Sequence, residues 1–523
     1  MSRRSRPVPA ALLLAAGLAA ALVLLPMVVT VAQAFGVTGD DAVALLWRPL
    51  VGTLLLNTIG LVLATVGVTA LVGVLCAWLV ERTDLPGRRA FAVLAAVPLA
   101  IPPFITSYAW VSLSSGLQDF LGALLVVGSA YMPLVYLPVA AALRGMDPAI
   151  EESGRVLGLD PWRCFVRLVL PQLRPALLGG MLLVALNVLV EFGAFALLRY
   201  RTFTTELYAQ YRTGLTGPDS ALLATVLIVL CLGCLTLELK VRGRRGTASL
   251  TRGARRAPAR YRLGAAKAPA LLFFGGLVVA TLGVPLGMIL FWLTQHNAAA
   301  TSAVGVSWTL VMQATAGSLS LALGGAALTL LLALPLGFLA VRYPGRTATL
   351  LERTAYLGQG VPGIVVALAL VTLALRALTP LYQSAPLLII AYAILFLPLA
   401  LVSVRAAFAQ AQLRLEEAGR VLGLGPLAVA CRIVLPLAAP GLGAAAALVF
   451  VAIVTELTTT LLLSPIGTET LATQVWADTT TLAFAAAAPY AAMMVLLSLL
   501  STWILARRFG RGGGPDGVVA GLG

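Results

Sequence analysis

Twelve apolar runs of bilayer-spanning length constrain this chain more than any other feature of its sequence. A helix that crosses the ~30 Å hydrocarbon core of a membrane needs about 20 mostly apolar residues, because each residue adds ~1.5 Å. Charged residues make up only 11% of the chain, whereas a soluble domain carries about 25%. The sequence therefore predicts an all-α membrane protein with spans near residues 10–34, 54–80, 90–112, 120–142, 176–198, 220–239, 268–293, 315–341, 357–378, 385–404, 441–463 and 482–505.

The positive charges predict how these spans are oriented. Alternating the spans from a cytoplasmic N terminus places 31 of the 36 Lys and Arg residues on the cytoplasmic side, as the positive-inside rule requires. Both termini are then cytoplasmic. The charges occupy short breaks between apolar runs, so the net charge of +16 indicates membrane topology and no nucleic-acid partner. The first run is long and is soon followed by another, which favours a retained anchor over a cleaved signal.

A basic segment divides the chain into two halves. Residues 240–267 hold ten Lys and Arg residues and no acidic residue, which is typical of a cytoplasmic linker that can lie against anionic lipid headgroups. We expect a first transmembrane half at 1–239, this basic linker at 240–267, a second transmembrane half at 268–508 and a flexible C-terminal tail at 509–523.

The two halves share one repeated sequence. Residues 151–159 (EESGRVLGL) recur as 416–424 (EEAGRVLGL), and the same offset of 265 relates Glu191 to Glu456. A constant offset indicates a duplicated unit with pseudo-twofold architecture. Because each half has an even number of expected spans, the copies have the same orientation and the axis should run along the membrane normal.

Each copy of the repeat predicts a helix, a turn and a second short helix on the inner side of the membrane. In the first copy Asp147 caps the first helix, Gly158 allows the turn, and Asp160-Pro161 begins the second helix. Gly425-Pro426 replaces Asp160-Pro161 in the second copy, which is a weaker cap. The apolar and acidic residues of such a projection can dock in a groove on a soluble partner.

These two loops resemble the EAA loop of importer permeases in the ABC (ATP-binding cassette) superfamily. The motif of that loop begins with Glu, two small residues, any three residues and Gly. Nine residues of any kind follow, and the motif ends with an aliphatic residue, any residue, Leu and Pro. Both copies have Gly and not Ala at the third position, which slightly weakens helix propensity. The matching residues are Glu152, Ser153, Gly154, Gly158, Leu168, Leu170 and Pro171 in the first copy, and Glu417, Ala418, Gly419, Gly423, Ile433, Leu435 and Pro436 in the second.

The resemblance implies an importer permease, a transport subunit and not an enzyme, with both transmembrane halves fused in one chain. In that family each loop inserts a coupling helix into a cytoplasmic ATPase. The expected partners are therefore two ATPase copies, which bind ATP and Mg, an extracytoplasmic substrate-binding protein, and the lipid of a bacterial inner membrane. The lysines Lys240 and Lys267 follow Leu and Ala, so this chain lacks the Gly-Lys pair of a phosphate-binding loop. We expect no cofactor on this chain.

Two further stretches bear on the substrate. Both halves contain segments that resemble the fused permeases of ferric-iron importers. These are residues 190–194 with 202–208 in the first half and residues 455–463 with 467–473 in the second. Thr-Glu-Leu-Thr at 455–458 stands where Lys-Glu-Leu-Pro is expected in that group, so thiamine and polyamine importer permeases stay open as alternatives.

Two other classes are weighed against an importer permease. A secondary transporter driven by an ion gradient also fits twelve spans, but it needs no docking loops for an ATPase. A membrane enzyme lacks a catalytic cluster, since the carboxylates are scattered and the chain has one histidine, His296. The five cysteines, among them the CxxC pair Cys231 and Cys234, are interpreted as packing residues. No metal ligand is firmly assigned.

Glu191 and Glu456 stand inside expected spans, where a carboxylate that faces lipid is costly. One hypothesis places both on the translocation path, as transient oxygen contacts for a cationic substrate. The other, which we favour, has each carboxylate hydrogen-bonded to a neighbouring helix.

Tyrosines and prolines near the outer side carry weaker hypotheses. Tyr200, Tyr208 and Tyr211 follow the fifth span, where they are ferric ligands or, as the favoured interpretation, interfacial anchors. Prolines inside the third and ninth spans, at 102, 103 and 362, predict either broken helices that line the path or ordinary kinks.

Overall fold

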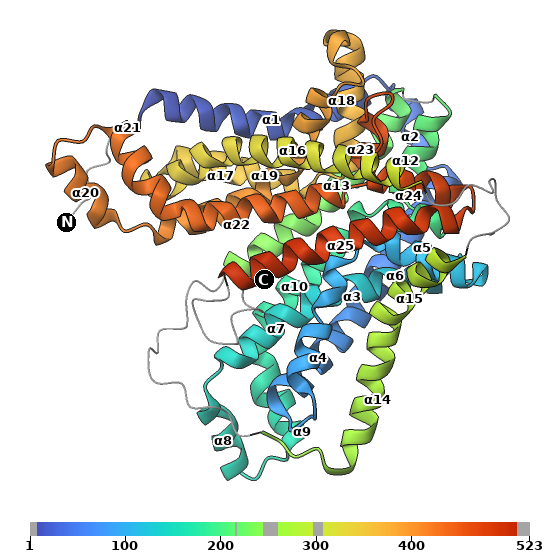
Figure 1. Cartoon of the computed structure of the whole chain (residues 1–523), viewed down its shortest axis with the longest axis vertical. Coiled ribbons are helices and arrows are strands. Elements are labelled where there is room, and N and C mark those ends of the chain that lie inside the picture. Colours follow the sequence, from blue (N-terminus) through green and yellow to red (C-terminus); the bar gives the residue numbers. More distant parts are fainter. Residues whose placement is uncertain (1–7, 215–216, 244–259, 296–306, 510–523) are drawn as a thin grey trace.

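The computed structural model describes residues 8–214, 217–243, 260–295 and 307–509, and within these ranges it is built of helices with no strand (Figure 1). The first half contains α1 (Ala10–Ala34), α2 (Gly39–Leu46), α3 (Pro49–Arg82), α4 (Arg88–Leu94), α5 (Pro103–Leu113), α6 (Phe120–Tyr131), α7 (Pro133–Gly145), α8 (Pro148–Val156), α9 (Pro161–Cys164), α10 (Leu170–Val190), α11 (Gly193–Leu197), α12 (Phe203–Arg212) and α13 (Pro218–Gly243). Residues outside the described ranges include much of the predicted linker, His296 and the residues after Phe509.

The second half repeats this order from the end of the linker. It contains α14 (Lys267–Val278), α15 (Val284–Thr294), α16 (Trp308–Arg342), α17 (Arg346–Leu357), α18 (Gly363–Ala377), α19 (Ala385–Gln410), α20 (Leu413–Val421), α21 (Pro426–Val429), α22 (Leu435–Val454), α23 (Thr458–Leu463), α24 (Leu471–Thr480) and α25 (Phe484–Phe509). Ten of the described helical stretches are long and apolar enough to cross a membrane, and two bent pairs bring the number to twelve. The all-α architecture is confirmed.

The third and ninth spans, expected at 90–112 and 357–378, are broken helices and not merely kinked ones. The chain bends by 94° between Ala100 and Pro103, and by 102° between Gly360 and Gly363. Ile101 and Val361 precede prolines and adopt extended backbone, with φ and ψ of −101° and 116° and of −104° and 115°. A proline lacks the N–H of the helix ladder and forces the residue before it out of the helical region. The prolines therefore break these spans.

The fifth and eleventh spans also end earlier than predicted. Helix α10 stops at Val190 and α22 at Val454, and short helices α11 and α23 follow. Glu191 is the residue at which α10 ends, with extended backbone, whereas the sequence placed it inside a continuous span at 176–198. Glu456 has the same place between α22 and α23, inside the span expected at 441–463.

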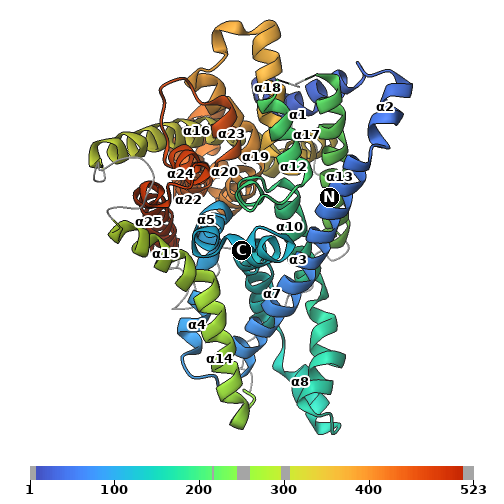
Figure 2. The ribbon, with the colours of Figure 1, turned by 90° about the vertical axis from the view of Figure 1, so that its right-hand side faces the viewer.

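The first span of each half packs against the other half. Helix α1 contacts α16, α17 and α18, and a Cβ at Gly358 would lie 2.6 Å from Val23 Cγ1. Conversely, α15 contacts α5, and Phe274 of α14 stacks on Phe91 at a ring distance of 4.6 Å. Figure 2 shows α14 beside α4. The sequence halves are thus interlocked in space.

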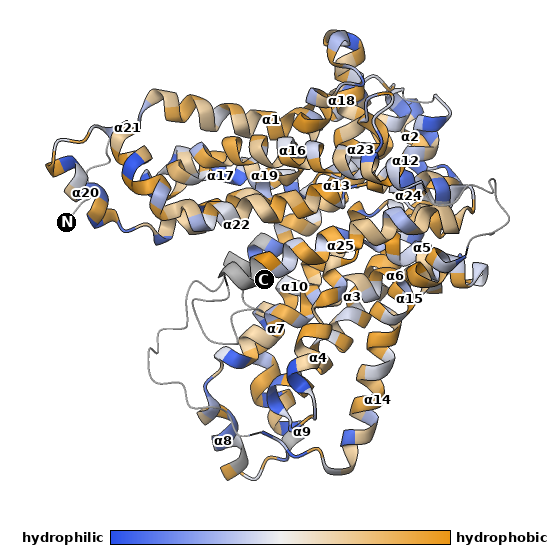
Figure 3. Ribbon diagram, viewed as in Figure 1, coloured by the Kyte–Doolittle hydropathy of each residue, from blue (hydrophilic) through white to orange (hydrophobic). Residues whose placement is uncertain are grey.

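The two repeated loops project from one face of this body. In Figure 1, α8–α9 lie at the bottom and α20–α21 at the left, where α1 also starts, whereas α2, α12 and α24 lie at the upper right. The helices α3, α7 and α10 run at a wide angle to α16, α19 and α22, and the two sets diverge towards the loops. Figure 3 shows apolar residues along the middle of the helices and polar residues at these two ends, as a membrane protein requires.

Candidate functional site

The repeated sequence folds as predicted in both copies, here named loop 1 (residues 147–171) and loop 2 (residues 412–436). In loop 1, Ala149 N donates to Asp147 Oδ1 (3.0 Å) at the start of α8, and Arg163 N donates to Asp160 Oδ1 (2.9 Å) at the start of α9. In loop 2, no side-chain hydrogen bond caps α20 or α21. Both second helices continue through a wider π-helical turn into the next span.

Glycines set the geometry of both loops. Gly158 and Gly423 have φ of +78° and +84°, a left-handed conformation that favours glycine. A Cβ on Gly154 would lie 2.6 Å from Leu168 Cδ1, and one on Gly419 would lie 2.5 Å from Ile433 Cδ1. The aliphatic residue of the motif therefore packs directly onto the small residue at the third position, which gives a physical reason for glycine there.

The remaining predicted residues fall into two groups. The acidic and first small residues face solvent, whereas the closing residues other than Pro436 are half-buried at the start of the next span. Exposed are Glu152, Ser153, Glu417, Ala418 and Pro436; half-buried are Leu168, Leu170, Pro171, Ile433 and Leu435.

A buried ion pair anchors each loop, and sequence reasoning missed it. Glu151 Oε1 lies 2.9 Å from Arg82 Nε, and Glu416 Oε1 lies 2.6 Å from Arg342 Nη2, with all four side chains at most 10% exposed. Each arginine ends the second span of its half. It also donates to a carbonyl at the end of the fourth span, Leu143 O or Ala411 O, at 2.9 Å in both cases.

The sequence did contain a signal for these pairs. Each motif begins with two consecutive glutamates, and the arginines recur as Arg82 and Arg342. Their offset is 260 and not 265, so a search at one constant offset passes over them.

The tips of both loops expose apolar side chains. Val156 and Leu157 are 87% and 80% exposed, and Val421 and Leu422 are 87% and 82% exposed. Each loop exposes a further apolar residue: Trp162, 71% exposed in loop 1, and Leu427, 82% exposed in loop 2. Exposed apolar patches of this kind mark interaction sites.

Glu191 and Glu456 each cap the short helix that follows them. Ala194 N donates to Glu191 Oε1 (3.0 Å), and Tyr131 Oη donates to Glu191 Oε2 (2.6 Å). Glu456 accepts from Thr459 N (3.0 Å) and Thr460 N (3.2 Å), and from both threonine hydroxyls. These are the bonds that a structural role requires.

The segments after the two carboxylates meet where the halves join. A Cβ on Gly193 would lie 2.8 Å from Leu457 Cδ2. The Phe192 ring lies 5.4 Å from Trp476 and 4.7 Å from Tyr208, which itself lies 6.0 Å from Trp476. Aromatic rings thus close the join between the halves on the side away from the loops.

The other two tyrosines that follow the fifth span also have packing partners. Tyr200 Oη donates to Asn57 O (3.3 Å), and its ring lies 6.1 Å from Phe120. Tyr211 lies against Tyr382. Among the described residues, no group of three or more His, Cys, Asp or Glu side chains is arranged to hold a metal ion.

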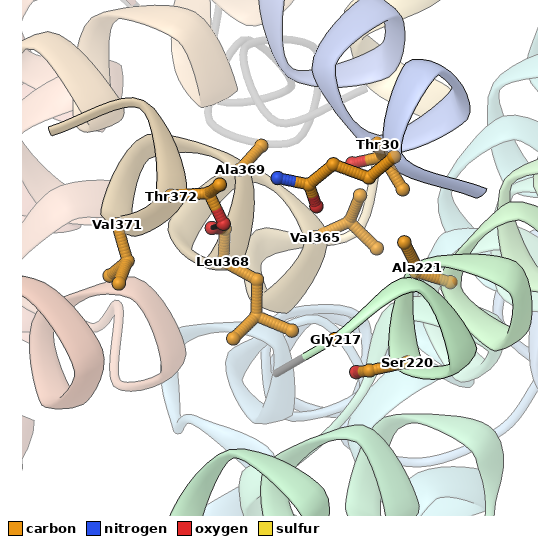
Figure 4. A pocket seen from close by; sticks show the side chains of 11 residues that line it. Thr30, Gly217, Ser220, Ala221, Val365, Leu368, Ala369, Val371 and Thr372 are labelled. Carbon is orange, nitrogen blue, oxygen red and sulfur yellow. Dashed lines mark hydrogen bonds between the residues drawn. The ribbon is translucent and has the colours of Figure 1, made fainter. Parts of the chain in front are cut away.

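Two small cavities open among the described helices. One lies between the C-terminal end of α1, the N-terminal end of α13 and helix α18, and its lining includes Thr30, Ser220 and Thr372 but no titratable side chain (Figure 4). The other borders Glu456 and is lined by Tyr392 and Thr460 among others.

Comparison with known proteins places these features in a family. Residues 69–239 and 333–509 each match the family described as binding-protein-dependent transport system inner membrane component. An Fe(3+)-transport system permease protein from Haemophilus influenzae is 36% identical over 484 residues, which are 92% of this chain and 95% of that protein. A molybdenum transport system permease protein from Escherichia coli is 30% identical over 158 residues, 27% of this chain and 66% of that protein. A sulfate transport system permease protein from Escherichia coli is 32% identical over 137 residues, 23% of this chain and 50% of that protein.

Proposed function

Because the chain belongs to the family of binding-protein-dependent transport system inner membrane components, we propose that it is the permease of an ATP-driven importer of ferric iron. The two loops on one face carry this proposal, since each combines a buried anchor with an exposed apolar tip. An anchored projection transmits force between a soluble motor and the membrane helices. A secondary transporter has no need of either loop.

The assignment of iron as the substrate is supported by how much of the chain the similarity to an Fe(3+) permease covers. The similarity to the Fe(3+) permease extends over 92% of the chain, whereas the molybdenum and sulfate permeases match 27% and 23% of it. Thiamine and polyamine importers are the less favoured alternatives.

The partners follow from the family. Transport of this class requires an ATPase and a substrate-binding protein, and the chain is a multi-pass protein of the inner membrane. We assign one ATPase copy to each loop, two in all, with ATP and Mg bound to the ATPase and no cofactor on this chain. Both termini are cytoplasmic in this assignment, and the halves extend over 1–239 and 268–508 with the linker and the tail outside the bilayer.

Movement of the loops must open the opposite side of the molecule. The halves diverge towards the loops and are closed by Phe192, Tyr208 and Trp476 at the other side. When the ATPases draw the loops together, the aromatic rings separate and admit substrate from the binding protein. Glu191 and Glu456 lie beside this path and hold α11 and α23 in place.

Uptake by the reconstituted complex tests the proposal. The chain is placed in proteoliposomes with its ATPase, the binding protein and radioactive ferric iron are added outside, and ATP is enclosed. We expect ATP-dependent iron accumulation that excess thiamine or spermidine does not reduce. Accumulation of labelled thiamine or spermidine instead of iron would replace the substrate assignment, and uptake driven by an ion gradient without ATP would replace the class.

A further inference from the structure

The end of the linker, residues 260–267, lies against loop 1. Tyr261 N donates to Arg82 O (2.8 Å), and Asp84 N donates to Tyr261 O (3.1 Å), which forms a short parallel bridge after α3. Leu263 N donates to Asp84 Oδ1 (2.8 Å), and Lys267 Nζ lies 2.9 Å from Asp84 Oδ2. The bond from Leu263 and then the Lys267 charge hold the pKa of Asp84 below its usual value. Backbone and charge thus fix the linker end to α3.

The Tyr261 side chain reaches the anchor of loop 1. Tyr261 Oη donates to Glu151 Oε2 (3.2 Å), and the other oxygen of this carboxylate pairs with Arg82. Glu151 is 4% exposed. A hydrogen bond to a buried charged group contributes more than one between neutral groups, so the linker contributes directly to the position of α8.

A row of aromatic rings continues from Tyr261 to the tip of loop 1. Tyr261 stacks on Trp78 at a ring distance of 6.1 Å, and Trp78 meets Phe165 edge-on at 6.2 Å. Phe165 stacks on Trp162 at 6.0 Å. The exposed Trp162 at the tip is therefore connected through three ring contacts to the linker.

Among the residues that the structure describes, no such row reaches loop 2. Phe338 has the place of Trp78, four residues before the anchoring arginine, but it packs on Phe408 at 5.5 Å. Ala430 and Leu427 stand in the places of Phe165 and Trp162. Pseudo-symmetry would require a segment that contacts loop 2 as residues 260–267 contact loop 1. The chain could supply it only from residues 1–9 or 506–523, and neither stretch contains a tyrosine.

We propose that Tyr261 is a positioning residue through which the linker controls loop 1 but not loop 2, so that the two ATPase docking sites couple unequally to transport. This rests on the proposed function of the loops. Lys267 begins α14, which packs on the first half through Phe274 and Phe91. A displacement of loop 1 by its ATPase therefore pulls on the first span of the second half, and a displacement of loop 2 does not.

Hydrogen exchange on the chain alone provides the first test. Full-length protein in lipid nanodiscs is compared with Tyr261→Phe, which keeps the ring and removes the hydroxyl, and with Tyr343→Phe, which removes a hydroxyl next to Arg342 in the second half. Losing a hydrogen bond to a charged group, worth about 1.5 kcal/mol at the lower end, predicts that the amides of α8 exchange about tenfold faster in Tyr261→Phe. The amides of α20 should be unchanged, and Tyr343→Phe should change neither helix.

Transport per ATP hydrolysed by the complete complex provides the second test. We expect Tyr261→Phe to lower this ratio in the wild-type background and in Glu416→Gln, but to add nothing to Glu151→Gln, since that variant already weakens the shared contact. Unchanged exchange in α8, equal acceleration in α20, or additive effects with Glu151→Gln would overturn the proposal. Failure of the proposed function is distinguishable, because wild-type chain would then fail to stimulate the ATPase whatever the exchange data show.

Discussion

Loop 1 and loop 2 have the same framework but different surroundings. Both have a buried glutamate paired with an arginine of the second span, a left-handed glycine and a glycine under an aliphatic side chain. Loop 1 adds helix caps, the Tyr261 hydroxyl and the aromatic row, whereas Glu416 of loop 2 has Arg420 at 3.7 Å as a second charge. The shared features are what a rigid projection requires, and the differences predict unequal roles for the two loops.

Removing the anchoring arginine should have the largest effect and should distinguish the loops most clearly. Arg82→Leu leaves Glu151 buried with no positive partner, and breaking a buried pair in this way costs about 3–5 kcal/mol. Arg342→Leu should cost less, because Arg420 remains near Glu416. Thermal unfolding of purified protein in detergent measures both losses.

A third arginine variant serves as the control. Arg144 pairs with Glu81 near the end of α3, but its side chain is 30% exposed, so Arg144→Leu should destabilise the protein less than Arg82→Leu. Equal destabilisation by Arg82→Leu and Arg342→Leu would remove the predicted difference between the anchors.

Substitution of the left-handed glycines should affect both loops alike. Nothing lies within 4 Å of a Cβ at Gly158 or Gly423, so Gly158→Val and Gly423→Val meet only backbone strain of about 1–3 kcal/mol. We expect inserted protein that permits ATP hydrolysis but loses most transport. The ratio of iron uptake to hydrolysis in proteoliposomes measures this uncoupling.

Gly425→Val is the matched control for these variants. Gly425 lies in loop 2 with extended backbone (φ −67°, ψ 165°) and open space around its Cβ. Normal coupling in this variant together with a loss in Gly423→Val would assign the effect to the left-handed turn. Full uptake in both left-handed variants would count against the docking role.

Truncation at the exposed tips should weaken ATPase binding unequally. Tryptophan is enriched among residues that dominate interfaces, and losses of 2 kcal/mol or more are typical of them. Trp162→Ala should therefore raise the Kd for the ATPase about 30-fold, and Leu427→Ala about fivefold. Titration of ATPase onto immobilised protein in nanodiscs gives both constants, and a larger effect at Leu427 would reverse the ranking of the loops.

The sequence predicted the spans and loops because their signals are local. Apolar length gives the number of spans, and Asp147, Gly158 and Asp160 determine the backbone near themselves. The bends at Pro102 and Pro362 also have a local cause, although the sequence alone left break and kink open.

Other features depend on contacts between distant segments. Arg82 and Glu151 meet only when the second span packs beside loop 1, and the α10 helix ends before Glu191 without a proline at that point. The first span of each half packs against the other half. This arrangement is likewise determined by packing in three dimensions, which a pattern of apolar residues does not specify.

The smallest predicted effect concerns the caps of the second helices. Asp160 caps α9, so Asp160→Ala should cost about 1 kcal/mol of local stability. Its ion pair with Arg163 (3.1 Å) is exposed and adds little. Gly425→Asp supplies the missing cap to α21, and the gain is only a few tenths of a kcal/mol because glycine is itself a fair N-cap. Exchange of the α9 and α21 amides measures both changes. Gly425→Asp could slow exchange in α21 without altering iron uptake per ATP. Capping would then differ between the loops without contributing to their unequal coupling. The unequal coupling would in that case depend on the linker contact and the aromatic row alone.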